Sequence, residues 1–190
     1  NNGMAHMFQM MNADRINTGV SGMTLASTAY LNALAYARER IQGSDLAGRK
    51  PGYVPIIDHP DVRRMLLWMK AHVEGMRSLI YYGALLLDRI RCETDPDRRE
   101  RWQGLMDLLT PVIKAYCSDK GFEVCSQAMQ VFGGYGYTRE YPVEQLLRDV
   151  RITAIYEGTN GIQAMDLLGR KLGQAQGRVF QDLLGEIQAV

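Results

Sequence analysis

Apolar residues recur at intervals of three and four along most of the chain, which is the spacing that places them on one face of an α-helix. The pattern predicts long helices over residues 8–40, 61–91 and 98–132, and shorter helices over 142–155 and 159–172. No segment shows the alternation of a half-buried strand. We therefore predict an all-α fold: an up-down four-helix bundle of long helices with short helices at its C-terminal end.

The first predicted helix carries a seam of small residues with an arginine at each end. The members of this seam are Arg15, Gly19, Gly22, Ala26, Ala29, Ala33, Ala37 and Arg40. A glycine inside a helix costs roughly 0.5–1 kcal/mol relative to alanine, so we expect the two glycines to serve close packing against another helix. The simplest interpretation of the two arginines is that they are solvated helix charges.

Two later segments interrupt the helical pattern. Residues 43–60 hold three prolines and three glycines, which predicts a long loop that is functional or wraps a neighbour. In the third predicted helix, Pro111 lacks a backbone donor, so we expect Thr110 to cap a helix that restarts there. The apolar stripe of this helix is expected to include Val112, Ile113, Tyr116, Lys120, Val124 and Ala128.

Composition excludes several classes of protein. The net charge is +1 without a dense basic run, which argues against a nucleic-acid surface. No apolar run is long enough for a transmembrane helix, and no basic-then-apolar leader is seen. We therefore expect a cytoplasmic protein, or alternatively one that is already processed. The three cysteines are an odd number without a Cys-x-x-Cys pair, which favours neither a disulfide framework nor a zinc site.

Domain organisation follows from length. The chain has 190 residues, enough for one domain with a sizeable core. We expect the helical bundle domain to span residues 1–173. Residues 174–190 are partly amphipathic and are expected to form a linker or the start of a following helical element.

Residues 130–163 carry the candidate chemistry. One carboxylate, Glu157, stands between an Ile-Tyr pair and a Gly-Thr pair, where one helix ends and Thr159 can cap the next. Apolar surroundings raise the pKa of a carboxyl group, which suits a general base near neutral pH. The alternative is that Glu157 only satisfies backbone donors or the helix dipole.

A glycine turn precedes this carboxylate. Gly133, Gly134 and Gly136 follow Gln130, and backbone N–H groups in such a turn can bind phosphate. The turn follows a helix rather than a strand, so it is not the dinucleotide fingerprint of a βαβ unit.

Together these residues resemble the acyl-CoA dehydrogenase family, specifically its C-terminal all-α domain, over residues 4–172. The motifs that carry the resemblance are Gln-Val-Phe-Gly-Gly-Tyr-Gly-Tyr (130–137), Glu-Tyr-Pro-Val-Glu (140–144), Arg-Asp-Val-Arg-Ile (148–152) and Ile-Tyr-Glu-Gly-Thr (155–159). The ending Asp-Leu-Leu-Gly-Arg-Lys is similar to larger bacterial-type members, which carry a further helical domain. The family's N-terminal helical domain and β-domain are missing, so the chain resembles a fragment, and the isolated fragment is expected to be inactive.

The resemblance implies FAD-dependent α,β-dehydrogenation of an acyl-CoA thioester to trans-2-enoyl-CoA. Glu157 would remove the pro-R α-proton, and the β-hydride would pass to flavin N5. The implied substrate contacts are Asn12, Arg15 and Tyr156. The implied FAD contacts are Arg40, Gln130, Gly133, Gly134 and Thr159, of which the first four reach the FAD of the neighbouring subunit. The implied partners are an electron-transfer flavoprotein or similar acceptor, and further copies in a homodimer or homotetramer.

Three departures from the family's pattern leave alternatives open. The usual Arg-x-Gln-Phe-Gly lacks its phenylalanine after Gln42, and Gly161 stands where relatives often have glutamine. Asp14 lies where some relatives carry the base on the first helix. An acyl-CoA oxidase, or a flavin-binding relative without dehydrogenase activity, would also fit the resemblance.

Overall fold

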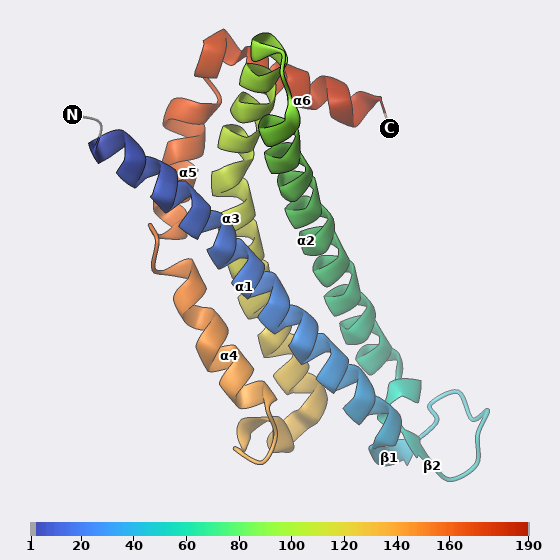
Figure 1. The fold of residues 1–190 in the computed structure, drawn as a ribbon. Helices are drawn as coiled ribbons and strands as arrows, with labels where there is room; N and C mark the ends of the chain where they lie inside the picture. Colours follow the sequence, from blue (N-terminus) through green and yellow to red (C-terminus); the bar gives the residue numbers. More distant parts are fainter. Residues whose placement is uncertain (1–2, 190) are drawn as a thin grey trace.

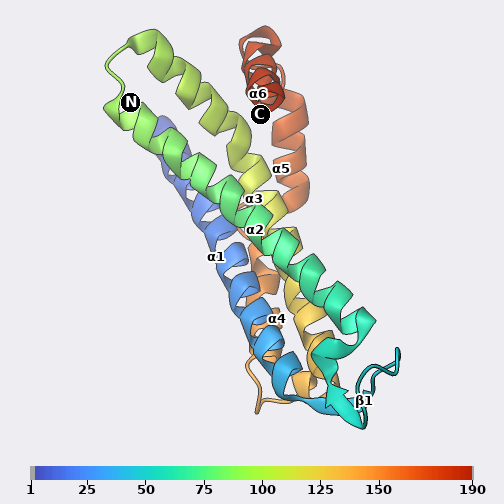
Figure 2. The same ribbon diagram turned by 90° about the vertical axis from the view of Figure 1, so that its right-hand side faces the viewer.

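The computed structural model describes residues 3–189 as an elongated bundle of helices (Figures 1 and 2). Three long helices, α1 (Gly3–Glu39), α2 (Pro60–Cys92) and α3 (Pro96–Phe132), run in alternating directions along the molecule. The short helices α4 (Val143–Arg151) and α5 (Asn160–Asp166) return along α3. The all-α prediction is confirmed, and three helices rather than four are long.

Shorter elements connect these helices. They are the turns η1 (Ile56–Asp58), η2 (Gly133–Tyr137), η3 (Ile152–Ala154) and η5 (Gln174–Gly177), the π-helical η4 (Leu167–Lys171) and the C-terminal helix α6 (Arg178–Gln188). The predicted loop 43–60 instead contains part of an antiparallel hairpin, β1 (Ile41–Ser44) with β2 (Tyr53–Pro55). The expectation of no strand was wrong here, because strands of three and four residues are too short to show alternation.

Helix α3 is the central element and touches α1, α2, α4, α5 and α6. The carboxylate of Asp95 caps its start by accepting from the backbone nitrogens of Asp97 and Arg98. Thr110 does not cap a second helix: its hydroxyl donates to the carbonyl of Met106 (2.8 Å), and α3 continues through Pro111. A proline inside a helix costs about 3 kcal/mol. Burial of the surrounding residues of α3 offsets this cost.

The inward face of α3 differs in part from the predicted stripe. Ile113, Val124 and Ala128 are fully buried as expected, but Tyr116 is 37% exposed. Lys114 is fully buried instead. Within residues 3–189, no helix is both long and apolar enough to cross a membrane.

The seam of small residues on α1 packs against α3 of the same chain. Ala26, Ala29, Ala33 and Ala37 are fully buried. A Cβ added to Gly22 would lie 2.6 Å from the carbonyl oxygen of Cys117, and one added to Gly121 would lie 2.8 Å from that of Gly22. The prediction of close helix packing is therefore confirmed.

Helix α6 lies beyond residue 173 and packs back on α2 and α3. Val179 sits 3.0 Å from the position of a Cβ on Gly104. Glu186 accepts a hydrogen bond from the hydroxyl of Tyr82 on α2 and lies 3.5 Å from the guanidinium of Arg101 on α3. Burial and this carboxylate raise the pKa of Tyr82 to about 12. The division of the chain at residue 173 stays a prediction.

We predict that Gly22→Ala destabilises the chain by about 1–3 kcal/mol, because the new methyl group must push apart two helix backbones. Gly75→Ala is the matched control, since the nearest atom to its Cβ is the hydroxyl of Tyr116 at 3.9 Å. It should be neutral or stabilise by up to about 1 kcal/mol. Thermal unfolding of both variants measures the difference, and an unchanged Tm for Gly22→Ala would contradict the close approach.

Candidate active site

Glu157 lies in the turn between η3 and α5, and its backbone is left-handed. The φ angle is +56° at Glu157 and +81° at Gly158. A residue with a side chain is strained there by roughly 1–2 kcal/mol, because its Cβ crowds the following carbonyl oxygen. Such strain persists only where the surrounding structure holds the residue, and it concentrates at functional sites. Ala175 and Gln176, in η5, are the other described non-glycine residues with a positive φ, and Glu157 is the only acidic residue of the three.

Gln163 on α5 holds this turn in place. Its side chain is 1% exposed, and its amide nitrogen donates to the carbonyl of Gly158 (3.0 Å) and, at 3.4 Å, to that of Glu157. Thr159 caps α5 as predicted, since its hydroxyl accepts from the backbone nitrogen of Ile162 (3.4 Å). Sequence analysis missed Gln163. The sequence signal that could have found it is a polar residue four positions after the cap Thr159, close enough to bond back to the segment before the helix.

Arg15 reaches the same turn from α1. It is 8% exposed, so it is not the solvated helix charge of the simplest interpretation. Its guanidinium lies 3.5 Å from the carboxylate of Asp166 and 3.4 Å from the amide oxygen of Asn12. Its Nη2 lies 3.8 Å from the position of a Cβ on Gly158. A buried cation thus stands beside the turn that carries Glu157.

A second buried cation, Lys114, approaches from α3. Its ammonium donates to the amide oxygen of Asn160 (2.8 Å), the first residue of α5. Burial lowers the pKa of Lys114, Arg15 lowers it further, and Asp119 and Glu157 oppose the shift. Sequence analysis missed Lys114, because an isolated lysine in a helix is usually exposed. It therefore also missed Asn160, which the structure places beside it.

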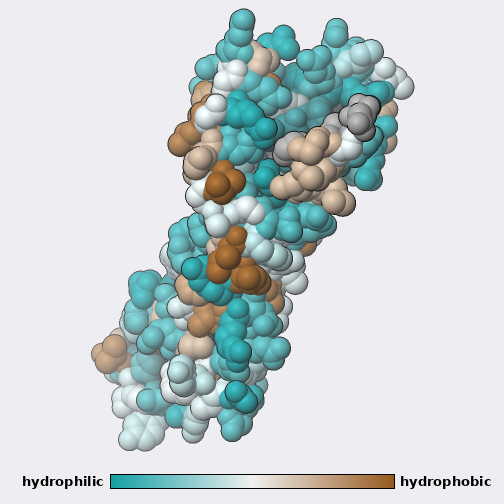
Figure 3. Space-filling model, turned by 90° about the vertical axis from the view of Figure 1, so that its left-hand side faces the viewer, coloured by the Kyte–Doolittle hydropathy of each residue, from teal (hydrophilic) through white to brown (hydrophobic). Residues whose placement is uncertain are grey.

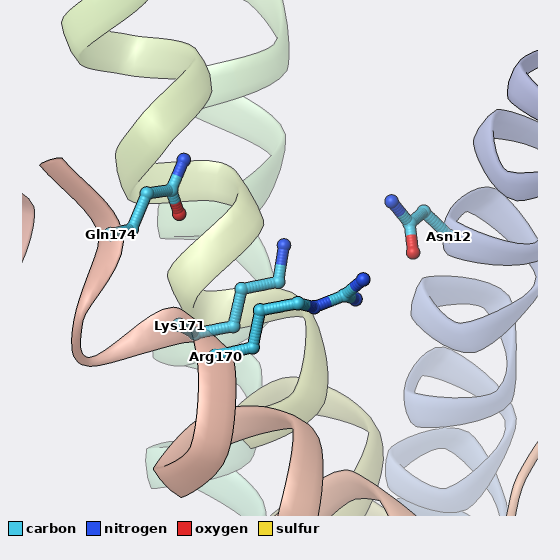
Figure 4. Close-up of a pocket in the computed structure, with 4 residues that line it drawn as sticks. All are labelled: Asn12, Arg170, Lys171 and Gln174. Carbon is cyan, nitrogen blue, oxygen red and sulfur yellow. The ribbon is translucent and has the colours of Figure 1, made fainter.

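Asn12 lines a cavity one turn along α1 from Arg15. The cavity has a volume of about 440 Å³ and is also lined by Arg170, Lys171 and Gln174. Figure 4 shows the Arg170 and Lys171 side chains extending from η4 toward the space between their segment and α1. Arg170 is paired with Asp166 (2.7 Å) and Lys171 lies 3.9 Å from Asp107, so carboxylates partly neutralise the two cations of this cavity.

An exposed apolar face flanks the turn. Its members lie on η3, on the turn and along α5 and η4, and each is 41–70% exposed: Ile152, Ile155, Tyr156, Ile162, Met165 and Leu168. Figure 3, which views the molecule from the side of α4 and α5, shows brown apolar surface near its middle. Glu157 itself is half-buried, in a turn that adjoins both Tyr156 of this face and the guanidinium of Arg15.

Three of the predicted FAD contacts come together at the other end of α1. Arg40, Gln130 and Gly133 line one cavity of about 350 Å³ beside the hairpin. The Nε of Arg40 is buried without a hydrogen-bond partner among the described residues, and its guanidinium lies 5.2 Å from the ring of Tyr135. A Cβ on Gly134 would meet nothing within 4 Å, so the turn leaves open space there.

The two groups of residues lie far apart. Arg15 is on α1 and Arg40 directly follows its last residue, so 25 residues at 1.5 Å per residue separate them by roughly 37 Å. One chain therefore presents two distinct sites, one around Glu157 with Asn12, Arg15, Tyr156 and Thr159, and one around Arg40.

A family model described as "Acyl-CoA dehydrogenase, C-terminal domain" matches residues 1–172. The chain belongs to the acyl-CoA dehydrogenase family. This finding confirms the resemblance seen in the sequence. The roles of the individual site residues stay proposals.

Relatives support the assignment along nearly the whole chain. A butyryl-CoA dehydrogenase of Syntrophomonas wolfei is 41% identical over 97% of this chain and 30% of the relative. A 3-methylmercaptopropionyl-CoA dehydrogenase of Ruegeria pomeroyi is 45% identical over 94% of this chain and 30% of the relative. The solved butyryl-CoA dehydrogenase of Megasphaera elsdenii shares 30% identity and a TM-score of 0.72 over 90% of this chain and 39% of that one. The chain thus spans about a third of each.

We predict that Glu157→Gly stabilises the chain by about 0.5–1 kcal/mol, because glycine removes the left-handed strain. For a domain of this size this raises Tm by about 1–4 °C. The matched control is Glu123→Gly on the surface of α3, where the same substitution in a regular helix should lower stability by about 1 kcal/mol. Equal destabilisation by both variants would show that Glu157 is not strained.

Proposed function

We propose that this chain is the C-terminal helical domain of an FAD-dependent acyl-CoA dehydrogenase, with Glu157 as the base. The observation that carries the proposal is the strained turn at Glu157, which adjoins a buried arginine on one side and an exposed apolar face on the other. A base of this kind removes a proton from the α-carbon of a thioester. The proton passes to a carboxylate oxygen of Glu157, and a double bond forms as hydride leaves the β-carbon, giving the trans-2-enoyl-CoA. FAD, when bound, accepts that hydride.

The residues around Glu157 suit an acyl-CoA. The apolar face that includes Tyr156 can cover the acyl chain, and the cation of Arg15 can attract the developing charge on the thioester oxygen. The cavity that Asn12 shares with Arg170 and Lys171 offers donors for phosphate groups of coenzyme A, and Arg170 would exchange its pairing with Asp166 for such a group.

The residues around Arg40 suit the phosphate and adenosine end of FAD. An unpartnered buried guanidinium nitrogen, an exposed Gln130 and open space at Gly134 form a fitting cradle. The separation from Glu157 supports a role of Arg40, Gln130, Gly133 and Gly134 in the neighbouring subunit's FAD site, with Thr159 at the FAD of its own subunit. The proposal therefore requires a homodimer or homotetramer.

The electron acceptor distinguishes a dehydrogenase from an oxidase. A relative from Acetobacterium woodii, 30% identical over 90% of this chain, is named as a subunit of a caffeyl-CoA reductase–Etf complex. That name supports an electron-transfer flavoprotein as acceptor for this protein. Hydrogen peroxide release by the full-length enzyme during turnover would identify an acyl-CoA oxidase instead.

Glu157→Gln in the full-length enzyme should lower turnover of an acyl-CoA by about 10²–10⁴-fold, because the amide cannot accept the proton. Bound FAD should be unchanged, and Glu123→Gln on the outside of α3 should leave turnover within about twofold. Turnover is measured with an artificial electron acceptor and saturating acyl-CoA. Normal turnover by Glu157→Gln with FAD bound would remove Glu157 from the mechanism and direct attention to Asp14. Inactivity of the unsubstituted enzyme with bound FAD across acyl-CoAs of graded length would favour the non-dehydrogenating relative.

Arg40→Ala in the full-length enzyme should weaken FAD binding by about 10–100-fold, the effect of losing a hydrogen bond to a charged group. Arg38→Ala, an exposed arginine two positions away on the last turn of α1, is the matched control. Fluorescence titration of the apoprotein with FAD measures both Kd values. Equal affinities in the two variants would exclude Arg40 from the FAD site.

A further inference from the structure

Lys114 is the feature of the site that the proposed mechanism leaves unused. It is the largest fully buried side chain of the described chain, and it lies in the middle of α3. Burying an ammonium group is unfavourable unless it is paired with compensating groups. Here it donates to a neutral amide oxygen, on Asn160, at 2.8 Å. A stabilising role alone would be served better by an apolar residue of the same size.

Asn160 links Lys114 to the turn of Glu157. Its amide nitrogen donates to the carboxylate of Asp119 (2.6 Å) and to the hydroxyl of Ser118 (2.9 Å). That hydroxyl in turn donates to the backbone carbonyl of Lys114 (2.7 Å). The first residue of α5 is thus hydrogen-bonded by three side chains of α3, those of Lys114, Ser118 and Asp119.

These hydrogen bonds to Asn160 act close to Glu157, the proposed base. Asn160 directly follows Thr159, the cap of α5, and stands three positions after Glu157. Two sets of hydrogen bonds hold the strained turn. In the first, the side-chain amide of Gln163 on α5 donates to the carbonyls of Glu157 and Gly158. In the second, the hydrogen bond from Lys114 to Asn160 holds the start of α5 against α3.

We propose that Lys114 is a positioning residue, which holds the carboxylate of Glu157 at the α-carbon of the substrate by anchoring Asn160. This inference rests on the proposed function. Lys114 does not touch the substrate in this proposal; it acts through Asn160. The charged groups that shift the pKa of Lys114 are Asp119, Arg15 and Glu157.

The test isolates proton abstraction in the full-length enzyme. An acyl-CoA with α-hydrogens but no β-hydrogen cannot be dehydrogenated, so exchange of its α-hydrogen for solvent deuterium reports on the base alone. Lys114→Met removes the charge and donor at similar length. It should slow this exchange, and kcat with an ordinary acyl-CoA, by about 10²-fold, the effect of a base displaced by about 1 Å. KM should change less than about threefold, because the substrate contacts remain.

Three further variants separate positioning from general damage. Lys120→Met, on the same helix with its ammonium paired to Glu123, should exchange within about twofold of the unsubstituted enzyme. Asn160→Ala, at a half-buried site, should slow exchange by at least about tenfold. Because Lys114 acts through Asn160, the double variant should lose no more than the more severely affected of the two single variants.

The outcomes decide between the two proposals. Normal exchange in folded, FAD-containing Lys114→Met would overturn the positioning role, as would normal exchange in Asn160→Ala if Lys114→Met does not fold. Glu157→Gln is assayed in parallel and should show no exchange. Exchange at the normal rate by Glu157→Gln would overturn the proposed base and the positioning role together, whereas its loss beside a normal Lys114→Met would overturn the positioning role only.

Discussion

The close approach of α1 and α3 is the contact on which the candidate site depends. Gly22 and Gly121 let the two backbones meet, because a Cβ on either residue would come within 2.8 Å of a backbone oxygen. The two helices run in the same direction (Figure 1). Positions seven residues upstream, Arg15 and Lys114, therefore lie at one level, about 10 Å from the contact. A packing contact between glycines thus sets two buried cations beside the start of α5.

Placing two cations in a helical core is unfavourable, and the structure compensates each differently. Arg15 lies within ion-pair distance of the carboxylate of Asp166, while Lys114 bonds an amide. The lowered pKa of Lys114 reflects this incomplete compensation, since burial and Arg15 both disfavour its charge. Stability alone does not account for such an arrangement. It is accounted for if the cations hold and attract the groups that react at Glu157, whose own backbone is strained.

The sequence predicted the helices and the seam because both follow from spacing over many residues. It also predicted the cap at Thr159, where a polar residue stands just before an apolar run. It failed where tertiary packing overrides local preference. Pro111 lies inside a continuous helix because α3 is surrounded, and Lys114 is buried although a lone lysine is normally exposed. The β1–β2 hairpin is too short to have a periodic signal.

The positions of the predicted site residues were also beyond spacing arguments. The motifs assigned Arg40 and Glu157 to the same reaction. In the structure, however, the length of α1 separates the residues around Arg40 from those around Glu157 by roughly 37 Å. That separation is itself informative. The Arg40 cavity and the Glu157 turn cannot serve one compact group in the same chain, so under the proposed function each must be completed from elsewhere. The bundle then contributes to two sites at once: a base and substrate contacts to one, and an anion-binding cradle to another. Under the proposed function, neither site is complete until other parts of the assembly meet it, and the α1–α3 contact then serves to hold both partial sites on one rigid bundle.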